Sequence, residues 1–493
     1  ARIEKVVEKA LTFARNSPEP DPASVRLHVF ANPINPPVAM RRGVSGKTRQ
    51  QGWLEAVRDG IAEEMRANPA IFYFGEGTGE RGGSFAHTKN LWQEFGADRM
   101  VDTPISEQGF TAAAVGASAT GARTVSDLMF ADFAFETAGQ IFLQAAKLRY
   151  MTSGVMSAPM VVRVGAGALR SSGPHHSGIY HPVFAHMPGL IVCVPSTPAD
   201  AKGLMKTALR AGDPVIMLEP KALFASKGEV PVGEHFVPFG VARIAREGRD
   251  ITIVAAGQMV QRALEAAQAL SAEGIEVEIV DPRTIMPLDI DTIVASVRKT
   301  HRLLVVDEAW AMCGMGGEIA QTINELAFDE LDAPPGRLHT APTSHPFAPV
   351  LERAMLVDAA RIAEGVRAVI AGRPPVPDHW YTVGLKGDAP VAPAPVQTPA
   401  APTPTAKAMP AASAGNDEPI TMPFGDLTVS EGRLVRWLKA VGDAVREGEL
   451  IAEIETDKAV VEIEAPVSGT LVAIDQPVGA VVPMGGRIGG IRK

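Results

Sequence analysis

The chain has 493 residues, of which 46% are hydrophobic and 21% charged, and its formal net charge at pH 7 is −9. This length is too great for one hydrophobic core and predicts about three domains. Such mild acidity argues against nucleic acid or an anionic membrane as a main partner, and we find no apolar run long enough to span a bilayer.

The cysteine content excludes two further kinds of structure. Cys193 and Cys313 are the only two cysteines, and neither belongs to a Cys-x-x-Cys pair. This excludes a disulfide scaffold and a cysteine-based zinc site, and it suits a reducing compartment. We therefore expect a cytoplasmic protein of the bacterial type, with the mitochondrial matrix as an open alternative.

The first 47 residues are predicted to form a connector that lies outside the main domains. Residues 1–31 fit one amphipathic helix, a proline-rich turn and an extended tail. The prolines end the helix because they cannot continue its hydrogen bonding.

In residues 48–226, short and nearly continuous apolar runs alternate with helix-like patterns. Strands buried on both faces of a parallel sheet have this composition. The helix-like stretches are 54–65, with apolar residues at helical spacing, and 110–121, which is rich in small residues. The strand-like runs are AIFYFGE (70–76), TVSDLMF (124–130), PMVVRVG (159–165), LIVCVP (190–195) and VIMLEP (215–220).

Residues 235–373 repeat this alternation, after a polar segment with proline and glycine at 226–234 that we take as a domain boundary. Helical patterns at 258–272 and 316–328 separate the strand-like runs. These runs are ITIVAAG (251–257), VEIVDP (277–282) and RLLVVDEA (302–309). Alternating strands and helices predict an α/β fold with two doubly wound open sheets.

A change of composition marks residues 384–417 as a linker. From Gly387 to Asn416 the sequence is almost wholly Ala, Pro, Thr and Ser. Such a stretch cannot bury enough apolar area to fold, and at about 3.1 Å per residue it behaves as an extended spacer. A passive joint would need far less length, so we expect that the segment after it travels.

Residues 418–493 contain an internal repeat with a constant offset of 37, since 469 − 432 = 37. Two copies of a short β-unit predict a small all-β sandwich with twofold pseudosymmetry. The first copy has Gly432, Leu434, Val435, Gly442, Val445, Gly448 and Ile451, and the second has Gly469, Leu471, Val472, Gly479, Val482, Gly485 and Ile488.

Lys458 lies between two runs of alternating polar and apolar residues, which predicts a β-hairpin with this lysine at its tip. The surrounding sequence Glu-Thr-Asp-Lys-Ala (455–459) resembles that of a lipoyl (barrel-sandwich) domain. Biotin carriers share the fold, but they place Met on both sides of their lysine. The resemblance implies lipoate on Lys458; the plain alternative is an ordinary surface lysine.

Residues 99–133 contain the motifs Asp-Thr-Pro-Ile-Ser-Glu (102–107) and Phe-Ala-Asp-Phe (130–133). They are similar to those of the β subunit of the decarboxylating component of 2-oxo acid dehydrogenase complexes, in the transketolase-like group that uses thiamine diphosphate. The likeness implies a pyrimidine-binding domain in 48–226 and a transketolase C-terminal domain in 235–373.

By this resemblance, Glu107 is the catalytic glutamate that hydrogen-bonds the 1′ nitrogen of the cofactor's aminopyrimidine. A charge-assisted bond there favours the imino tautomer, which accepts a proton. The plain alternative is a carboxylate that favours a helix start. Glu76 matches an acidic family residue near the cofactor and would relay protons, or it is a loop carboxylate. Phe130 and Phe133 would offer aromatic faces to the pyrimidine, or they only pack in the core.

The stretch 171–189 holds four of the eleven histidines. No Cys or acid accompanies them at the spacing of metal ligands, so we predict no metal site. The resemblance implies that His176 faces the substrate as a proton donor, with His175 as a weaker candidate and His181 and His186 as structural residues. The family usually has glutamine where this chain has Gly178.

The sequence contains no Gly-Asp-Gly, the motif with which the family holds Mg²⁺ and the cofactor's diphosphate. We therefore expect an α subunit or domain to supply Mg²⁺ binding, in a dimer of αβ units. Residues 1–31 resemble the end of that α subunit. We hypothesise that the chain is the later part of an α–β–lipoyl fusion; the alternative is an N-terminal helix peculiar to this protein.

The resemblance implies decarboxylation of a branched-chain-type 2-oxo acid or of pyruvate, with reductive acylation of lipoyl-Lys458. An acyltransferase core and a dihydrolipoyl dehydrogenase are the further partners it implies. Two alternatives remain open: cleavage of a ketol such as acetoin on the same scaffold, and a catalytically silent lipoyl carrier.

Overall fold

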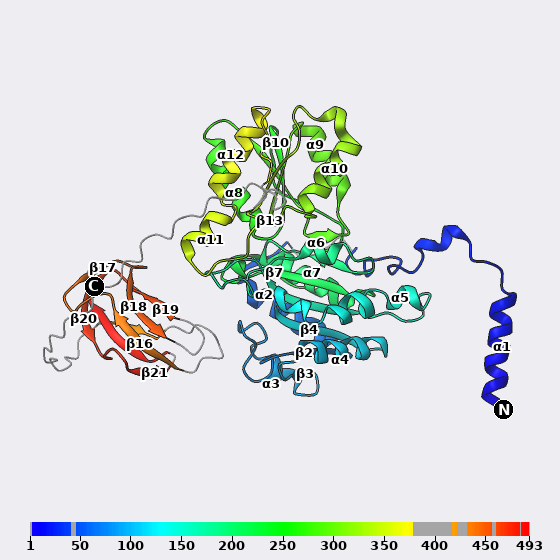
Figure 1. The fold of residues 1–493 in the computed structure, drawn as a ribbon, viewed down its shortest axis with the longest axis horizontal. Coiled ribbons are helices and arrows are strands. Elements are labelled where there is room, and N and C mark those ends of the chain that lie inside the picture. Colours follow the sequence, from blue (N-terminus) through cyan, green and yellow to red (C-terminus); the bar gives the residue numbers. More distant parts are fainter. Residues whose placement is uncertain are drawn as a thin grey trace, which may run out of the picture. The chain divides into compact units, whose positions relative to one another are not determined.

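The computed structural model describes residues 2–40, 46–377, 417–422, 431–455, 460–483 and 485–492. It divides into two compact units, Ala1–Pro390 and Val391–Lys493 (Figure 1). Within the described residues, no helix is both long and apolar enough to cross a membrane.

The N-terminal stretch contains the helix that its sequence predicts, but residues 27–30 form turns and bends in place of the predicted extended tail. Helix α1 (Arg2–Asn16) is followed by the short 3-10 helix η1 (Pro22–Arg26). Further along, Ala31 donates its backbone N–H to Asp213 over 2.7 Å. The side chain of Asn35 exchanges two hydrogen bonds with the backbone of Phe239. These bonds fasten residues 31–35 of the connector to both α/β domains.

The first α/β domain is built on a seven-stranded sheet with the order β12-β6-β7-β5-β4-β2-β3. All neighbours run parallel except β12, which is antiparallel to β6. The strands are β2 (Ile71–Gly75), β3 (Met100–Asp102), β4 (Arg123–Phe130), β5 (Met160–Ala166), β6 (Ile191–Cys193), β7 (Val215–Pro220) and β12 (Thr284–Met286).

Helices cover both faces of this sheet, so its strands are buried as their apolar runs predict. Helices α2 and α7 pack on one face, and α4 packs on the other. The helices are α2 (Trp53–Ala67), α3 (Leu91–Phe95), α4 (Glu107–Ala119), η2 (Ala131–Phe135), η3 (Gly139–Ala145), α5 (Leu148–Met151), α6 (His181–Ala185), α7 (Pro198–Arg210) and η4 (Lys221–Leu223).

The second domain has a five-stranded sheet with the order β14-β13-β10-β11-β9, in which only β9 is antiparallel to its neighbour. Helices α8 and α12 cover one face, and α9 and α10 cover the other (Figure 1). Its elements are β9 (Arg243–Arg246), β10 (Ile251–Ala255), α8 (Gln258–Ser271), β11 (Val277–Asp281), α9 (Ile290–Thr300), β13 (Leu303–Trp310), α10 (Met315–Ala327), η5 (Phe328–Glu330), β14 (Gly336–Thr340), α11 (Pro349–Met355) and α12 (Ala359–Ile370).

The two domains are more closely joined than the polar boundary at 226–234 suggests. One hydrophobic core takes residues from both sheets, and β12 of the second domain extends the sheet of the first. The boundary segment itself contains β8 (Lys227–Pro231), which pairs antiparallel with β1 (Thr48–Gly52). The sequence does not predict this pairing, because neither strand has an apolar run.

The second unit is the all-β sandwich that the repeat predicts. Its two four-stranded sheets have the orders β15-β22-β20-β17 and β19-β18-β16-β21. Elements of the two copies correspond at the offset of 37: β16 with β20, β17 with β21, and β18 with β22. The strands are β15 (Glu418–Thr421), β16 (Glu431–Trp437), β17 (Ala444–Val445), β18 (Leu450–Glu455), β19 (Val460–Glu464), β20 (Gly469–Ile474), β21 (Val481–Pro483) and β22 (Arg487–Arg492).

Two pairs of repeated glycines have matching backbone angles. The φ values are 101° at Gly442 and 90° at Gly479, and 78° at both Gly448 and Gly485. These angles lie in the region that residues with a side chain rarely adopt. The repeat therefore preserves the turns as well as the apolar pattern.

We predict that Gly479→Ala lowers the free energy of unfolding of the second unit by about 1–2 kcal/mol. The added Cβ would meet no atom within 4 Å, so the cost comes from the positive φ alone. Calorimetric unfolding of the full chain would measure the effect. Gly479→Asn is the matched control and should lose less, because Asn tolerates this conformation better. Equal losses would contradict the explanation.

Candidate active site

The predicted site residues of the first domain gather at one edge of its sheet. Because β2, β3, β4, β5 and β7 run parallel, their carboxyl ends share this edge. The residues that follow or end these strands are Glu76 after β2, Glu107 after β3, Phe130 at the end of β4, His176 after β5 and Lys221 after β7.

The sheet also has a point at which the chain reverses its winding direction. From β2 the chain moves to β3 on one side, whereas from β4 it moves to β5 on the other. In open α/β sheets, ligands bind in the crevice outside the carboxyl ends of the strands at such a point. Glu76 and Phe130 lie at the two strands that border it.

The negative charge of Glu107 acts on Glu76. Burial raises the pKa of Glu76 to about 7, and the negative charges of Glu107, Asp127 and Asp102 add to the rise. The Oε1 atom of Glu76 is buried and has no hydrogen-bond partner within the described part of the chain. A carboxyl group in this state can exchange a proton near neutral pH and can bond a ligand.

A buried polar network lies beneath this edge. Arg163 of β5 pairs with Glu219 of β7 over 2.6 Å and donates to the Tyr73 hydroxyl of β2 over 3.0 Å. The same hydroxyl donates to Asp127 of β4, and His87 lies 2.6 Å from that carboxylate. Burial by itself would raise the pKa of Asp127, but the charges of His87 and Arg163 hold it well below its ordinary value.

Phe130, Phe133 and His176 form one edge-to-face cluster. The ring centroids are 5.4 Å apart for Phe130 and Phe133, 4.7 Å for Phe130 and His176, and 5.5 Å for Phe133 and His176. All three side chains are only partly buried. The structure thus brings His176 to two phenylalanines that lie more than 40 positions before it in the sequence.

The other three histidines of the stretch 171–189 have different surroundings. His175 and His186 are exposed. His181 is 1% exposed, and its Nε2 lies 3.1 Å from the carboxylate of Asp307 in the second domain. Of the four histidines, only His176 belongs to the aromatic cluster.

The structure explains why this chain has Gly178 where the family usually has glutamine. A Cβ at this position would lie 2.2 Å from the ring of Tyr180. The Tyr180 hydroxyl donates to Asp132 over 2.8 Å, and the backbone N–H of Gly178 donates to the same carboxylate over 3.2 Å. A larger residue cannot fit while Tyr180 keeps this position.

Sequence analysis missed two charged residues beside the cluster. Lys221 is 2% exposed, and burial lowers its pKa to about 8. Glu308 of the second domain is 5% exposed, and burial raises its pKa to about 7. Lys221 follows directly on the apolar run VIMLEP, so its place at a carboxyl strand end could have identified it.

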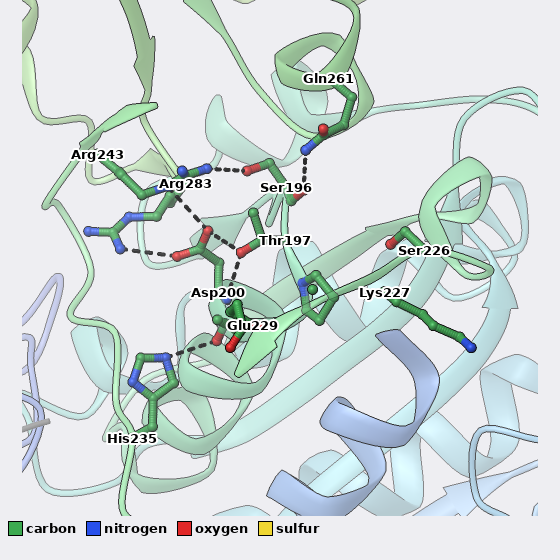
Figure 2. A pocket seen from close by; sticks show the side chains of 13 residues that line it. Ser196, Thr197, Asp200, Ser226, Lys227, Glu229, His235, Arg243, Gln261 and Arg283 are labelled. Atoms are coloured by element: carbon green, nitrogen blue, oxygen red, sulfur yellow. Dashed lines mark hydrogen bonds and ion pairs between the residues drawn. The ribbon is translucent and has the colours of Figure 1, made fainter. Parts of the chain in front are cut away.

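A separate pocket of about 490 Å³ lies where α7 begins, and none of the predicted site residues lines it. Figure 2 shows Arg243 and Arg283 directed at Asp200, at distances of 3.5 and 3.1 Å. Arg243 also bonds Ser196 and Asp281. Since carboxylates of the protein already neutralise both arginines, we assign this network to the junction of the two domains.

Comparison with known proteins agrees with this organisation. The model of the transketolase pyrimidine-binding domain matches residues 49–227, and that of the transketolase C-terminal domain matches 240–362. Over 316 residues the chain is 45% identical to the β subunit of the pyruvate dehydrogenase E1 component of Rhizobium meliloti. This alignment covers 64% of the chain and 69% of that protein.

The chain belongs to the E1 β-subunit family. It is also 44% identical over 327 residues to the β subunit of acetoin:2,6-dichlorophenolindophenol oxidoreductase of Cupriavidus necator, covering 64% of the chain and 96% of that protein. A mitochondrial E1 β subunit of rice is 42% identical over 316 residues, with 63% of the chain and 84% of that protein covered. The family and the fold predicted from the sequence are thereby confirmed.

Solved structures support the fold of this E1 β-type chain. A split-gene transketolase, described as an inactive β4 tetramer, matches with a TM-score of 0.51 at 22% identity. The match covers 65% of the chain and 99% of that structure. At this identity, the likeness concerns the fold alone.

The E1 β-type part is fused to a further domain. Residues 418–491 match the model named for biotin-requiring enzymes, which covers biotin and lipoyl domains. In this domain Glu455 pairs with Val460 at the end of the β18–β19 hairpin. Lys458 falls between these two residues and lies outside the described residues, as does the linker 384–416.

We predict that Glu76→Gln weakens the pH dependence of stability between pH 4.5 and about 7, the ordinary and the raised pKa of this group. In this window the folded chain holds a proton that the unfolded chain has released. Its free energy of unfolding therefore falls as pH rises. Urea midpoints from pH 5 to pH 8 would measure the slope. Glu107→Gln should make this slope partly shallower, because it removes a charge that raises the pKa of Glu76. Identical slopes in the wild-type chain and both variants would refute the prediction.

Proposed function

We propose that this chain is the catalytic β portion of a thiamine-diphosphate-dependent 2-oxo acid dehydrogenase, with a built-in lipoyl domain. The observation that carries the proposal is the pair of glutamates, Glu76 and Glu107, at the switch point of the first sheet. Their carboxyl groups lie close enough for the charge of one to raise the pKa of the other. Such groups occur at sites of proton transfer more often than in ordinary structural positions.

The residues present fit the aminopyrimidine of thiamine diphosphate. The unpartnered, buried Oε1 atom of Glu76 needs a hydrogen-bond donor, and the aromatic side chains Phe130 and Phe133 offer an apolar wall. When bound, the cofactor supplies the electron sink for loss of carbon dioxide. We propose that Glu107 bonds the ring nitrogen of the cofactor and that Glu76 exchanges a proton with the site near neutral pH.

His176 is proposed to face the substrate and to donate a proton. Its ring packs edge-to-face against the rings of Phe130 and Phe133. These contacts restrict the orientations of the imidazole. Its place on the loop after β5 puts it at the same sheet edge as the glutamates. An imidazole suits proton transfer because its ordinary pKa lies near physiological pH.

The diphosphate end of the cofactor and Mg²⁺ are proposed to be held by an α subunit or domain. The basis is the missing Gly-Asp-Gly motif. Within the described ranges, no group of three His, Cys, Asp or Glu side chains is placed to hold a metal ion. We propose that the active site forms between α and β portions, in a dimer of αβ units.

The lipoyl domain is proposed to carry the acyl group away on Lys458. Lipoate on Lys458 would supply a disulfide that accepts two electrons and the acyl group, which would leave one sulfur acylated and the other protonated. An acyltransferase core would then accept the acyl group, and a dihydrolipoyl dehydrogenase would reoxidise the dithiol. Tethering through the Ala/Pro-rich stretch would keep the lipoyl group at high effective concentration near each catalyst.

Cleavage of acetoin is a second candidate function. It is favoured by the 44% identity to the acetoin oxidoreductase β subunit, of which the alignment covers 96%. The glutamate pair and the aromatic cluster serve the cofactor in either reaction, so they do not choose between the substrates. A panel of branched-chain 2-oxo acids, pyruvate and acetoin with ferricyanide as electron acceptor would decide.

We predict that Glu107→Gln lowers the ferricyanide-coupled rate of the complete assembly at least 100-fold, because the amide cannot provide the charge-assisted bond. The control is Glu265→Gln on α8, which removes a carboxylate that is 53% exposed and should leave the rate unchanged. A catalytically silent carrier would lose nothing in either variant, and that result would refute the proposal.

We predict that Lys458→Arg affects acyl transfer but not the ferricyanide-coupled rate. This variant keeps the charge but cannot form the amide with lipoate, so the intact mass should lack one lipoyl group. The ferricyanide-coupled rate should persist, whereas transfer of the acyl group to the acyltransferase should be lost. Lys439→Arg in the same domain is the control. Normal acyl transfer by Lys458→Arg would contradict the proposed attachment site.

A further inference from the structure

The side chain of Lys221 joins two members of the aromatic cluster. Lys221 is the first residue of η4, directly after β7. Its ammonium group donates a hydrogen bond to the backbone carbonyl of His176. The same nitrogen lies 4.8 Å from the ring centroid of Phe130, a distance typical of a cation–π contact.

Three carboxylates that act electrostatically on this ammonium group also bind the loop that contains His176, residues 167–180. Asp132, Glu308 and Glu352 all act on Lys221 electrostatically. Asp132 accepts the N–H of Gly178 over 3.2 Å. Glu308 accepts the N–H of Ala168 over 2.9 Å, and Glu352 accepts the N–H and hydroxyl of Ser171, each over 3.0 Å.

The loop is therefore held by opposite charges at different backbone groups. Carboxylates bind N–H groups near its two ends, and the lysine binds the carbonyl of His176, two residues before Gly178. Two of the three acids come from the second domain, so hydrogen bonds to the loop cross the domain boundary. The ammonium also favours the charged form of the buried Glu308, which burial by itself disfavours.

We propose that Lys221 is a positioning residue for the His176 loop, which fixes the backbone of His176 and the Phe130 ring relative to each other. This inference rests on the proposed role of His176 in the reaction. Lys221 acts through that histidine and not on the substrate.

Two observations favour positioning over direct binding of a substrate carboxylate. With 2% of its surface exposed, Lys221 has almost no free surface for a ligand. Its charge is already faced by three carboxylates, which weaken the attraction for a further anion. A proton-bearing nitrogen bonded to a backbone carbonyl is instead well suited to hold that carbonyl in place.

The first test measures the loop itself in the full chain, independently of any reaction. Lys221→Met should raise amide hydrogen exchange at least tenfold at Ala168, Ser171 and Gly178, and Lys221→Arg should restore most of the protection. The matched control is Lys227→Met, an exposed lysine six residues later. If the exchange of the loop is the same in all variants, Lys221 does not position it.

The second test is a double-mutant cycle in the complete assembly with thiamine diphosphate and Mg²⁺. Lys221→Met should lower kcat at least tenfold and change the cofactor Kd less than twofold. Combined with His176→Ala, it should cause no further loss, because residues that act through one another are not additive. An equal loss in the His176→Ala background would overturn the proposal.

The two tests separate the two hypotheses. If His176→Ala keeps full activity while Lys221→Met still loosens the loop, the proposed role of His176 fails and the positioning stands. If Lys221→Met does not fold, Lys221→Gln keeps a hydrogen-bond donor without the charge. It should then give loop exchange rates above those of the wild-type chain; wild-type rates in Lys221→Gln would overturn positioning by the charged ammonium group.

Discussion

The candidate site depends on a buried ion pair between Arg163 and Glu219, which links neighbouring strands β5 and β7. Through Tyr73 the arginine also reaches β2, and through Asp127 the network reaches β4. Each strand thus contributes one polar side chain a few residues before its carboxyl end. Removing one partner of such a network leaves a buried charge uncompensated, at a cost of about 3–5 kcal/mol. The network therefore fixes the relative positions of the strand ends from which the site residues project.

A second constraint comes from the joining of the two α/β domains. They share a hydrophobic core, the second domain adds strand β12 to the sheet of the first, and the two meet at the His176 loop. Glu308 and Glu352 bind backbone amides of this loop, and Asp307 binds His181 at its end. The second domain, which contributes none of the predicted catalytic residues, thus determines the conformation of a loop in the first. A family match to two separate domain models does not reveal this dependence.

The pKa values of the site follow from the burial of its charged side chains. Glu76 and Glu308 have raised pKa values of about 7, and Lys221 has a lowered pKa of about 8. In each case burial disfavours the charged form, and the nearby charges modify this effect. Groups with such values can change their protonation in the range in which enzymes work.

The sequence by itself determined the alternation of strands and helices, the repeat of the β-sandwich, and the motifs around Glu107 and Phe130, because these depend on local period and residue type. It also placed Glu76 and His176 after strands. Only the tertiary structure decided which of these residues meet, since strand order is not encoded in local pattern: β4 lies beside β2, and β7 beside β5. It alone showed that, of the four histidines, His176 is the one that meets Phe130 and Phe133, and it revealed Lys221, whose importance lies in contacts with residues distant in the chain.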